Sequence, residues 1–374
     1  MSPPRERPLS VNDLVIVDCD VHANDPPEAL APYCDTPWRV SLEHLGTVPH
    51  RYLEAPGYAP ASAFELPIPG RGLHNRVVTS ANQMRSELDA MAIDIGILFP
   101  DYLLRMAVLP NAKFAAAVAR AYNAWLDERW VDPARGLYGA VVAAPQDPAD
   151  AAREIRKYGA RPGFVGVFLP TCAVRPLWGH TMYDPIFEAA QETGCPVMLH
   201  SVGGILHTNF PFNTEQFATQ LARHSVEHGF ALMGNIFSMI ETGMPARFPD
   251  LNIVFTEGGV SWVPYVMWHL DKEYHELRHQ APLLEKPPSH YVREFYYCTQ
   301  PVEEPERPQD LVTLIDLIDG RDHVVFASDW PHHDFDHPRA VMTKPFPAET
   351  KRKIMGETAL ALFGITAPAS NRTA

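Results

Sequence analysis

Acidic and imidazole side chains follow an apolar run near the start of the chain. Residues 14–17 are apolar and lead directly into Asp18-Cys19-Asp20-Val21-His22. Residues i and i+2 of a strand point to the same side, so we expect the Asp20 carboxylate and the His22 imidazole to converge. A carboxylate beside an imidazole suits a divalent cation. The same pair also fits an ordinary capped or salt-bridged turn, so the rest of the chain must decide between the two interpretations.

Three later apolar runs also end in ionisable residues. PVMLH ends at His200, IVFTEGG contains Glu257, and VVFASDW contains Asp329. Each residue has an ordinary interpretation by itself, as a satisfied core histidine, a helix cap or a turn cap. A metal site explains all of the positions together. Two imidazoles and two carboxylates favour Zn²⁺ or Mn²⁺, with one position open for water or substrate.

The elements that would position these residues alternate between strands and helices. Short, near-continuous apolar runs predict strands of a parallel sheet that is buried on both faces. They span 15–18, 93–99, 137–143, 164–169, 196–200, 251–257, 295–299 and 324–328. Helices are expected between or after them at 81–91, 112–129, 147–158, 185–193, 215–242 and 348–363. The alternation predicts an α/β fold of the (β/α)8 TIM-barrel type, whose chemistry sits at the C-terminal ends of the strands.

An open, doubly wound sheet is the alternative fold. It would need a nucleotide-binding fingerprint after an early strand, and the sequence has none there. We expect one barrel domain over residues 1–374. Residues 35–80 contain many Pro, Gly and aromatic residues and are expected to form a long insertion after the first strand, a candidate lid over the barrel mouth. Residues 275–294 suggest a second excursion, and 348–374 a C-terminal helix and tail.

Composition narrows the class of protein. The chain has 374 residues, of which 46% are hydrophobic and 20% charged, as in an ordinary globular enzyme. The net charge of −14 argues against nucleic acid and anionic membranes as partners. The five cysteines form no CxxC pair, which suits a reducing cytoplasm. We recognise neither a signal peptide nor a membrane-spanning run, so a cytoplasmic location is expected.

Aromatic residues at or just after the expected strand ends would wall a pocket for a planar substrate. They are Phe99, Tyr102, Phe168, Trp262 and Trp330. Packing at the barrel rim is an equally good interpretation for each one singly.

Other polar residues could support the site. A substrate carboxylate would need a cation, and Arg76 and Arg105 are candidates by position, although both also suit an ordinary surface. His332 could hydrogen-bond to a metal ligand. His224 and His228 have metal-compatible spacing on an expected helix, but no HExxH pattern accompanies them, so we expect a helix surface.

The ordered set of motifs resembles the amidohydrolase superfamily. Within it, the chain is similar to the group that contains aminocarboxymuconate-semialdehyde decarboxylase, γ-resorcylate decarboxylase and 5-carboxyvanillate decarboxylase. The resemblance covers most of the chain. Its motifs are DxH at 20–22, ELDAMAID at 87–94, PVMLH at 196–200, the run RFPDLNIVFTEGGVSWVPYVMWHLD at 247–271, SDWPH at 328–332 and MGETALALFG at 355–364.

The resemblance implies a (β/α)8 barrel with one divalent metal ion. It implies metal ligands at Asp20, His22, His200 and Asp329, with Asp329 also as the proton carrier. The family decarboxylases carry a histidine where this chain has Glu257. An ionised Glu257 would repel a substrate carboxylate unless the metal offsets it, could act as a general base for water, or could hydrogen-bond to a ligand histidine.

These observations favour a metal-dependent carboxy-lyase that performs non-oxidative decarboxylation of a small aromatic or unsaturated carboxylic acid. The alternative enzyme is a metal-dependent hydrolase of an amide, lactone or C–C bond, with Asp329 or Glu257 as the base for metal-activated water. A binding protein built on an inactive barrel is a third hypothesis, which the intact ligand set disfavours. A homo-oligomer is implied by the resemblance alone.

Overall fold

The computed structural model describes residues 9–45, 78–201, 217, 219–332 and 334–367. Most of the insertion expected at 35–80, together with Arg76, lies outside the described residues. The expectations of a lid and of one domain over 1–374 therefore stay predictions. None of the helices within the described ranges has the length and apolar content to cross a membrane.

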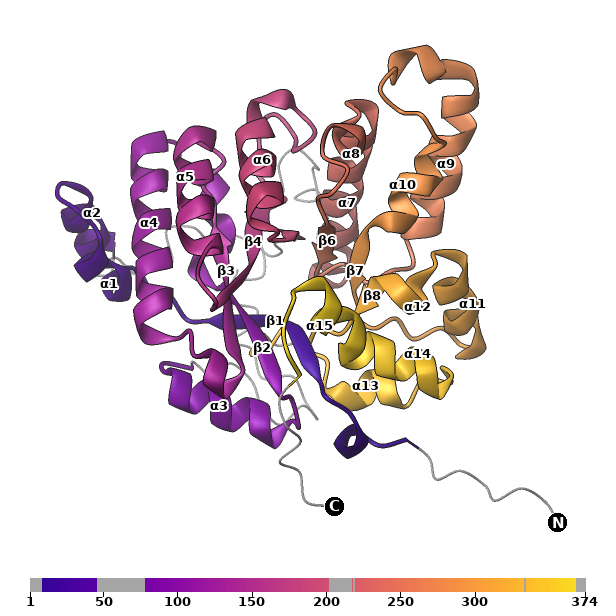
Figure 1. Cartoon of the computed structure of the whole chain (residues 1–374), viewed down its shortest axis with the longest axis horizontal. Helices are drawn as coiled ribbons and strands as arrows, with labels where there is room; N and C mark the ends of the chain where they lie inside the picture. Colours follow the sequence, from indigo (N-terminus) through magenta and orange to yellow (C-terminus); the bar gives the residue numbers. More distant parts are fainter. Residues whose placement is uncertain (1–8, 46–77, 202–216, 218, 333, 368–374) are drawn as a thin grey trace.

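Eight parallel strands form one sheet in sequence order, β1 to β8, with helices between them (Figure 1). The sheet closes on itself between β8 and β1. A parallel bridge joins Val21 to Trp330, and the His22 N–H donates to the Trp330 carbonyl at 2.7 Å. The Cys19 N–H donates to the Phe326 carbonyl at 3.0 Å. The predicted (β/α)8 barrel is thus confirmed, and the open doubly wound sheet is excluded.

The strands are short and lie close to the predicted runs. They are β1 (Val17–Ala23), β2 (Ile95–Pro100), β3 (Leu137–Val142), β4 (Phe164–Pro170), β5 (Val197–His200), β6 (Ile253–Thr256), β7 (Tyr296–Cys298) and β8 (Val324–Val325). The main difference is β1, which begins later than predicted and continues through Asp20 and His22. The tight pairing of β1 with both β2 and the segment after β8 extends it past the aspartates.

The α-helices cover the outside of the barrel and its ends (Figure 1). They are α1 (Pro27–Leu30), α2 (Trp38–Leu45), α3 (Ala81–Ala90), α4 (Ala112–Arg129), α5 (Pro148–Gly159), α6 (Asp184–Thr193), α7 (Gln220–Glu241), α8 (Met244–Arg247), α9 (Val263–Leu277), α10 (Pro288–Glu294), α11 (Gln309–Leu317), α12 (Gly320–His323), α13 (Pro338–Met342), α14 (Ala348–Arg352) and α15 (Thr358–Leu362). The 3₁₀ segment η5 (Tyr102–Val108) follows β2. The excursion predicted at 275–294 contains the end of α9, a short connection and α10.

Local sequence explains where several helices begin. The Ser80 hydroxyl accepts from the Gln83 N–H at the start of α3. Asp147 accepts from the Asp150 N–H at 3.0 Å, with Pro148 as the first residue of α5. Both are ordinary N-caps that satisfy otherwise free N–H groups. The helix predicted at 348–363 is instead divided by a π-helical segment, Lys353–Glu357.

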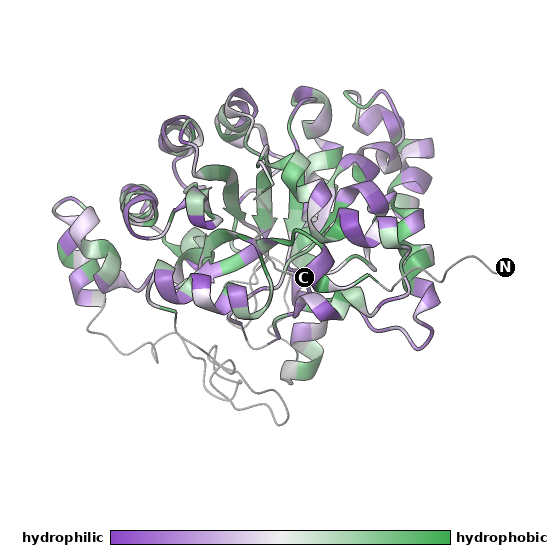
Figure 2. Cartoon of the chain, turned by 60° about the horizontal axis from the view of Figure 1, so that its bottom comes forward, coloured by the Kyte–Doolittle hydropathy of each residue, from purple (hydrophilic) through white to green (hydrophobic). Residues whose placement is uncertain are grey.

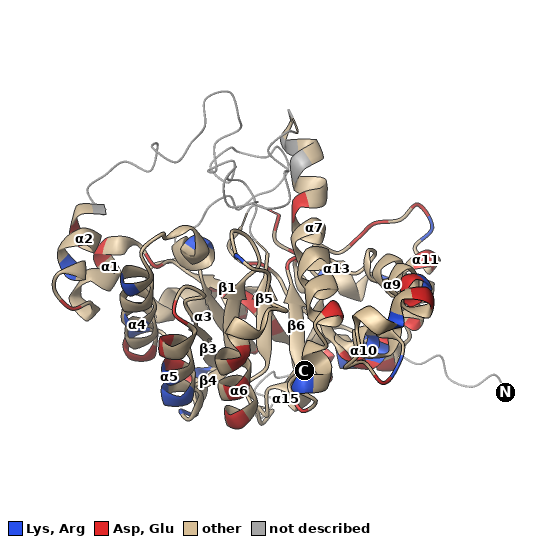
Figure 3. Cartoon of the chain, turned by 90° about the horizontal axis from the view of Figure 1, so that it is seen from above, with Lys and Arg blue, Asp and Glu red and all other residues tan. Residues whose placement is uncertain are grey.

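The strands carry the hydrophobic core. Every residue of β1, β2, β4, β5 and β6 is buried, which fits strands covered by helices outside and by side chains within. Figure 2 shows the strands as predominantly hydrophobic and the surrounding helices as mixed. Figure 3 shows charged residues mainly on those helices. All five cysteines are buried and none of them forms a disulfide.

Candidate metal centre

Four ionisable side chains from β1, β5 and the segment after β8 meet inside the barrel. They are Asp20, His22, His200 and Asp329. The His22 Nε2 lies 3.2 Å from Asp20 Oδ1 and 2.9 Å from Asp329 Oδ1. The His200 Nε2 lies 3.1 Å from the same Asp20 oxygen. All four side chains are fully buried, and one ligand atom from each lies within 4.8 Å of the others.

The backbone departs from regular strand geometry where the carboxylates are held. The register between β1 and β2 shifts between Asp18 and Val21, as a β-bulge around Asp20 would produce. Asp329 has a φ of 63° and Glu257 a φ of 60°, in the left-handed region that non-glycine residues rarely adopt. Such backbone strain costs about 1–3 kcal/mol per residue and clusters at functional sites. The Asp329 N–H donates to the Asp20 carbonyl at 3.0 Å, which holds the turn after β8 against β1.

Both imidazoles present the same nitrogen to the centre of the cluster. The His22 Nδ1 lies 2.7 Å from the Pro100 carbonyl oxygen, and the His200 Nδ1 lies 2.6 Å from the Ser201 carbonyl oxygen. A carbonyl oxygen only accepts, so Nδ1 carries the hydrogen in both rings. Their Nε2 atoms therefore face the carboxylates, which is the usual arrangement of histidines that bind a metal.

The donor set fits a divalent cation. Asp20 Oδ2 is buried and has no hydrogen-bond partner within the described part of the chain. A buried polar atom without a partner costs roughly 1–3 kcal/mol, and a cation would satisfy it. Two imidazole nitrogens with carboxylate oxygens form a mixed set that suits Zn²⁺ or Mn²⁺.

The charges in the cluster shift the pKa values of its members. Burial lowers the pKa of His22, but its carboxylate neighbours Asp20 and Asp329 outweigh burial and raise that pKa to about 10. Burial likewise opposes a rise in the pKa of His200, which Asp20 nevertheless raises. Burial raises the pKa of Asp329, and the nearby Glu257 carboxylate adds to the rise. Asp329 therefore retains a proton more readily than an ordinary aspartate.

His332 links Asp329 to the barrel mouth. Its Nδ1 lies 2.7 Å from Asp329 Oδ1, and its Nε2 lies 3.6 Å from Asp101 Oδ1. Its ring stacks on His22 with the centroids 4.1 Å apart. The Asp101 side chain is 40% exposed, whereas Asp329 is fully buried. The series Asp329–His332–Asp101 thus connects the buried carboxylate with solvent.

Glu257 contacts the outer side of His200. Its Oε2 lies 3.3 Å from the His200 Nδ1, accepts from the Ser201 hydroxyl at 3.0 Å, and lies 3.5 Å from the His228 Nδ1. Burial raises the pKa of Glu257, but the imidazoles of His228 and His200 outweigh burial and lower it to about 2. Glu257 thus lies beside the His200 Nδ1, whose hydrogen is directed at the Ser201 carbonyl, and its role among the three considered stays a prediction.

His228 is a member of the site that sequence reasoning placed elsewhere. We expected it on a helix surface with His224, but it is only 6% exposed and contacts both Ser201 and Glu257. The expectation was wrong because α7 turns this part of its surface toward the ends of β5 and β6. The signal in the sequence was the four-residue spacing of the two histidines, with Glu227 between them in an HxxEH pattern.

The aromatic candidates separate into two groups. Phe99 and Phe168 are fully buried, and their ring centroids lie 5.3 Å and 5.9 Å from that of His200. Trp262 instead packs edge-on against Phe255 and Tyr297, whose side chains point outward because they alternate with inward-facing neighbours. The structure therefore places Trp262 in barrel packing, contrary to a role in the pocket wall.

The remaining candidates lie near the rim. Trp330 is 1% exposed and packs edge-on against Phe335. Arg105 is half-buried on η5, where burial lowers its pKa and the Asp101 carboxylate opposes that change. Tyr102 begins the same segment.

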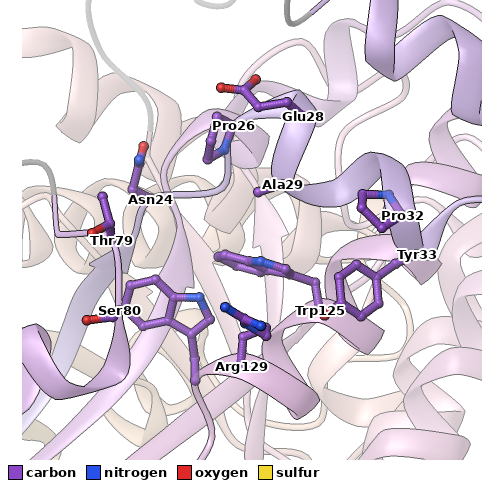
Figure 4. A pocket seen from close by; sticks show the side chains of 11 residues that line it. Asn24, Pro26, Glu28, Ala29, Pro32, Tyr33, Thr79, Ser80, Trp125 and Arg129 are labelled. Atoms are coloured by element: carbon purple, nitrogen blue, oxygen red, sulfur yellow. The ribbon is translucent and has the colours of Figure 1, made fainter.

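A separate pocket lies beside the barrel (Figure 4). It has a volume of about 430 Å³ and is lined by the start of the segment after β1 and by the end of α4, including Asn24, Tyr33, Trp125 and Arg129. None of the four clustered residues lines it. The pocket is therefore distinct from the candidate metal centre.

Comparison with known proteins shows which family the chain belongs to. The sequence model described as Amidohydrolase matches residues 89–365. The chain belongs to the amidohydrolase family. One relative is the γ-resorcylate decarboxylase of Rhizobium radiobacter, which is 25% identical over 344 residues and aligns with 86% of this chain and 96% of its own. The superfamily resemblance inferred from the motifs is thereby confirmed.

Solved structures share the fold. The 5-carboxyvanillate decarboxylase of Sphingomonas paucimobilis superposes with a TM-score of 0.69 at 22% identity, over 94% of this chain and 100% of that chain. The 5-carboxyvanillate decarboxylase of Novosphingobium aromaticivorans, complexed with manganese and 4-hydroxy-3-methoxy-5-nitrobenzoic acid, has a TM-score of 0.70 at 18% identity, over 96% of this chain and 98% of that chain. These likenesses show that the chain shares the fold of these proteins.

Proposed function

We propose that this amidohydrolase is a metal-dependent enzyme that removes CO₂ from a small aromatic or unsaturated carboxylic acid. The observation that carries the proposal is the cluster of two imidazoles and two carboxylates within 4.8 Å, fully buried at one end of the barrel. The decarboxylase activities of its relatives support the choice of reaction.

The four clustered residues would hold the ion. They are Asp20, His22, His200 and Asp329. Manganese in one relative makes Mn²⁺ the first ion to test, with Zn²⁺ equally compatible with the donor types. When bound, the ion supplies positive charge that attracts the oxygens of an acidic substrate and stabilises negative charge as the bond to CO₂ breaks.

Asp329 is the proposed proton donor. Burial raises its pKa and so favours its protonated form, and its Oδ1 lies 2.7 Å from the His332 Nδ1. The proton moves from Asp329 to the ring carbon that bears the carboxylate. The bond to that carboxylate then breaks, its electron pair restores the ring, and CO₂ leaves. His332 and the half-exposed Asp101 provide a route by which solvent returns the proton to Asp329.

Glu257 and its neighbours bear on the choice between the two enzyme reactions. A carboxylate here was expected to repel an acidic substrate. Its Oε2 instead contacts the imidazoles of His200 and His228, at 3.3 Å and 3.5 Å, on the outer side of the metal cluster. Its low pKa and its contact with the Ser201 hydroxyl also make Glu257 a weak base for water. Both observations favour decarboxylation over hydrolysis.

The first experiment combines elemental analysis with product analysis. Protein purified without chelator is assayed on a panel of hydroxylated benzoic acids before and after metal removal. We expect Mn²⁺ or Zn²⁺ in the protein and CO₂ release that stops on stripping and returns with the metal. Cleavage of esters or amides without CO₂ release would replace the proposal with a hydrolase. Metal binding without turnover of either kind would favour a binding protein.

A further inference from the structure

A second group of metal-binding side chains lies on α7. His224, Glu227 and His228 are spaced i, i+3 and i+4, so they share one face of the helix. The stretch reads His-Ser-Val-Glu-His, an HxxEH pattern of the kind that binds zinc through its two histidines in one class of metalloproteases. One ligand atom from each of the three lies within 4.8 Å of the others. The two imidazole centroids are 4.9 Å apart.

The two ring nitrogens of His228 differ in their hydrogen-bond partners. Its Nδ1 faces the Ser201 hydroxyl and the Glu257 carboxylate. Its Nε2 is buried and has no hydrogen-bond partner among the residues that the structure describes. Buried polar atoms are almost always satisfied, so this nitrogen indicates a missing occupant.

The Glu227 carboxylate lies near enough to the His228 Nε2 to bind the same ion. Glu227 is only 1% exposed, and its Oε1 lies 3.9 Å from the His228 Nε2, too far for a hydrogen bond. Two ligand atoms on one tetrahedral Zn²⁺ are about 3.4 Å apart, given metal–ligand bonds of roughly 2.1 Å. A small movement of either side chain would therefore bring both atoms onto one ion.

The charge of the surroundings also favours a cation. Three carboxylates, Glu227, Glu257 and Asp334, lie within 4 Å of the imidazoles of His224 and His228. Buried carboxylates are costly unless cations compensate them. A divalent ion bound by these imidazoles would add positive charge beside the carboxylates, and Glu257 would then support the ligand His228 by accepting from its Nδ1.

We propose that His224, Glu227 and His228 form a second divalent-cation site, of the type that binds Zn²⁺, with a fourth position open to water or substrate. Glu257 joins this site to the proposed metal centre, since the same carboxylate oxygen lies 3.3 Å from the His200 Nδ1 and 3.5 Å from the His228 Nδ1. The inference goes beyond the proposed decarboxylation and does not require it.

The test is the stoichiometry of Zn²⁺ binding to chelator-stripped full-length protein, measured by calorimetric titration and by elemental analysis after gel filtration. We expect two ions per chain for the wild type. His224→Asn and Glu227→Gln should each remove one ion, and His22→Asn should remove the other. His224 is the safer variant, because its side chain is already 26% exposed. His275→Asn, an exposed histidine on α9, is the matched control and should retain both ions.

The variants separate this proposal from the proposed function. Circular dichroism first establishes that each variant is folded. One ion in the wild type that His224→Asn and Glu227→Gln retain and His22→Asn loses would overturn the second site. One ion with the opposite pattern of losses would support the second site and overturn the centre at His22 instead.

Discussion

At the scale of the residue, Asp329 joins the metal-binding geometry to the proton chemistry. Its Oδ1 contacts the His22 Nε2 at 2.9 Å and the His332 Nδ1 at 2.7 Å. Its left-handed backbone, with a φ of 63°, directs the carboxylate into the cluster. A single strained residue thus meets both a candidate ligand and the route to solvent.

Replacing Asp329 with Asn should lower CO₂ release by about 10²–10⁴-fold, the usual contribution of a general acid or base. The amide keeps the size of the carboxyl group but cannot donate this proton, so circular dichroism should be unchanged. Asp310→Asn, on the exposed surface of α11, is the control and should retain activity. Full activity in Asp329→Asn would refute its role as proton donor.

Replacing His332 with Asn should lower kcat more than it raises KM, because His332 contacts Asp329 and Asp101 and is proposed to return protons. The expected loss is about 10²-fold, at the lower end for proton transfer. Steady-state kinetics on the best substrate of the panel give kcat and KM separately for the wild type and the variant. A change confined to KM would show that His332 binds substrate instead.

Asp25 should make stability depend on pH. It is fully buried and accepts from the N–H groups of Asp101, Tyr102 and Leu103, at 2.7–3.2 Å. Burial and the Asp101 carboxylate raise its pKa from 3.8 to about 8. The folded state thus holds a proton that the unfolded state loses near pH 4. The protonated Asp25 carboxyl group therefore contributes fully to the free energy of unfolding below about pH 4. As the pH rises from about 4 toward 8, this contribution falls by up to about 1.4 kcal/mol per pH unit.

Urea unfolding of the wild type and Asp25→Asn at pH 5 and pH 8 tests this. The variant cannot ionise at this position, so the stability advantage of the wild type should be smaller at pH 8. Asp310→Asn should show a constant difference from the wild type. An advantage that stays the same at pH 5 and pH 8 would mean that Asp25 is already ionised in the folded protein at pH 5.

At the scale of the element, the C-terminal segment packs against the backbone that leads into the first strand, β1. The π-helical segment Lys353–Glu357 brings Gly356 against the backbone just before β1. A Cβ at Gly356 would lie 2.1 Å from the Val15 carbonyl oxygen, a distance that no real Cβ tolerates. The Phe326 N–H donates to the Ile354 carbonyl at 2.8 Å, so the same segment also holds the end of β8.

Gly356→Ala should therefore lower the free energy of unfolding by about 1–3 kcal/mol, as overpacking typically does. Gly229→Ala is the matched control, because a Cβ there would meet only Trp262 at 3.7 Å. Gly229 lies inside α7, where alanine stabilises a helix by up to about 1 kcal/mol. Chemical denaturation of both variants should give changes of opposite sign, and a neutral Gly356→Ala would contradict the close contact.

At the scale of the whole molecule, the proposed metal joins β1, β5 and the segment after β8, which are far apart in the chain. Metal removal should lower stability, by about 2.7 kcal/mol if the free ion had been at one hundred times its Kd. Thermal unfolding with and without chelator measures the change, and added Mn²⁺ or Zn²⁺ should reverse it. His200→Asn should show a smaller response, and a wild type indifferent to chelator would argue against a metal in the barrel.

The sequence by itself was sufficient to predict the (β/α)8 barrel. It was also sufficient to predict that four polar residues, now seen to be buried, would lie near one another. The apolar runs and capped helices are local signals, and a (β/α)8 fold brings the C-terminal ends of all its strands together. Asp20, His22, His200 and Asp329 could therefore be grouped before any coordinates, although their roles as ligands stay a proposal. The motifs also sufficed for the family.

The tertiary structure decided what depends on helix orientation and on backbone irregularity. It placed His228 beside Glu257 and turned Trp262 away from the site, because the rotation of a helix around a barrel depends on packing that no local pattern specifies. It also placed Asp329 and Glu257 in left-handed conformations, which residues other than glycine adopt only when the surrounding structure enforces them. The pairing of Glu257 with both His200 and His228 follows from these contacts between distant segments.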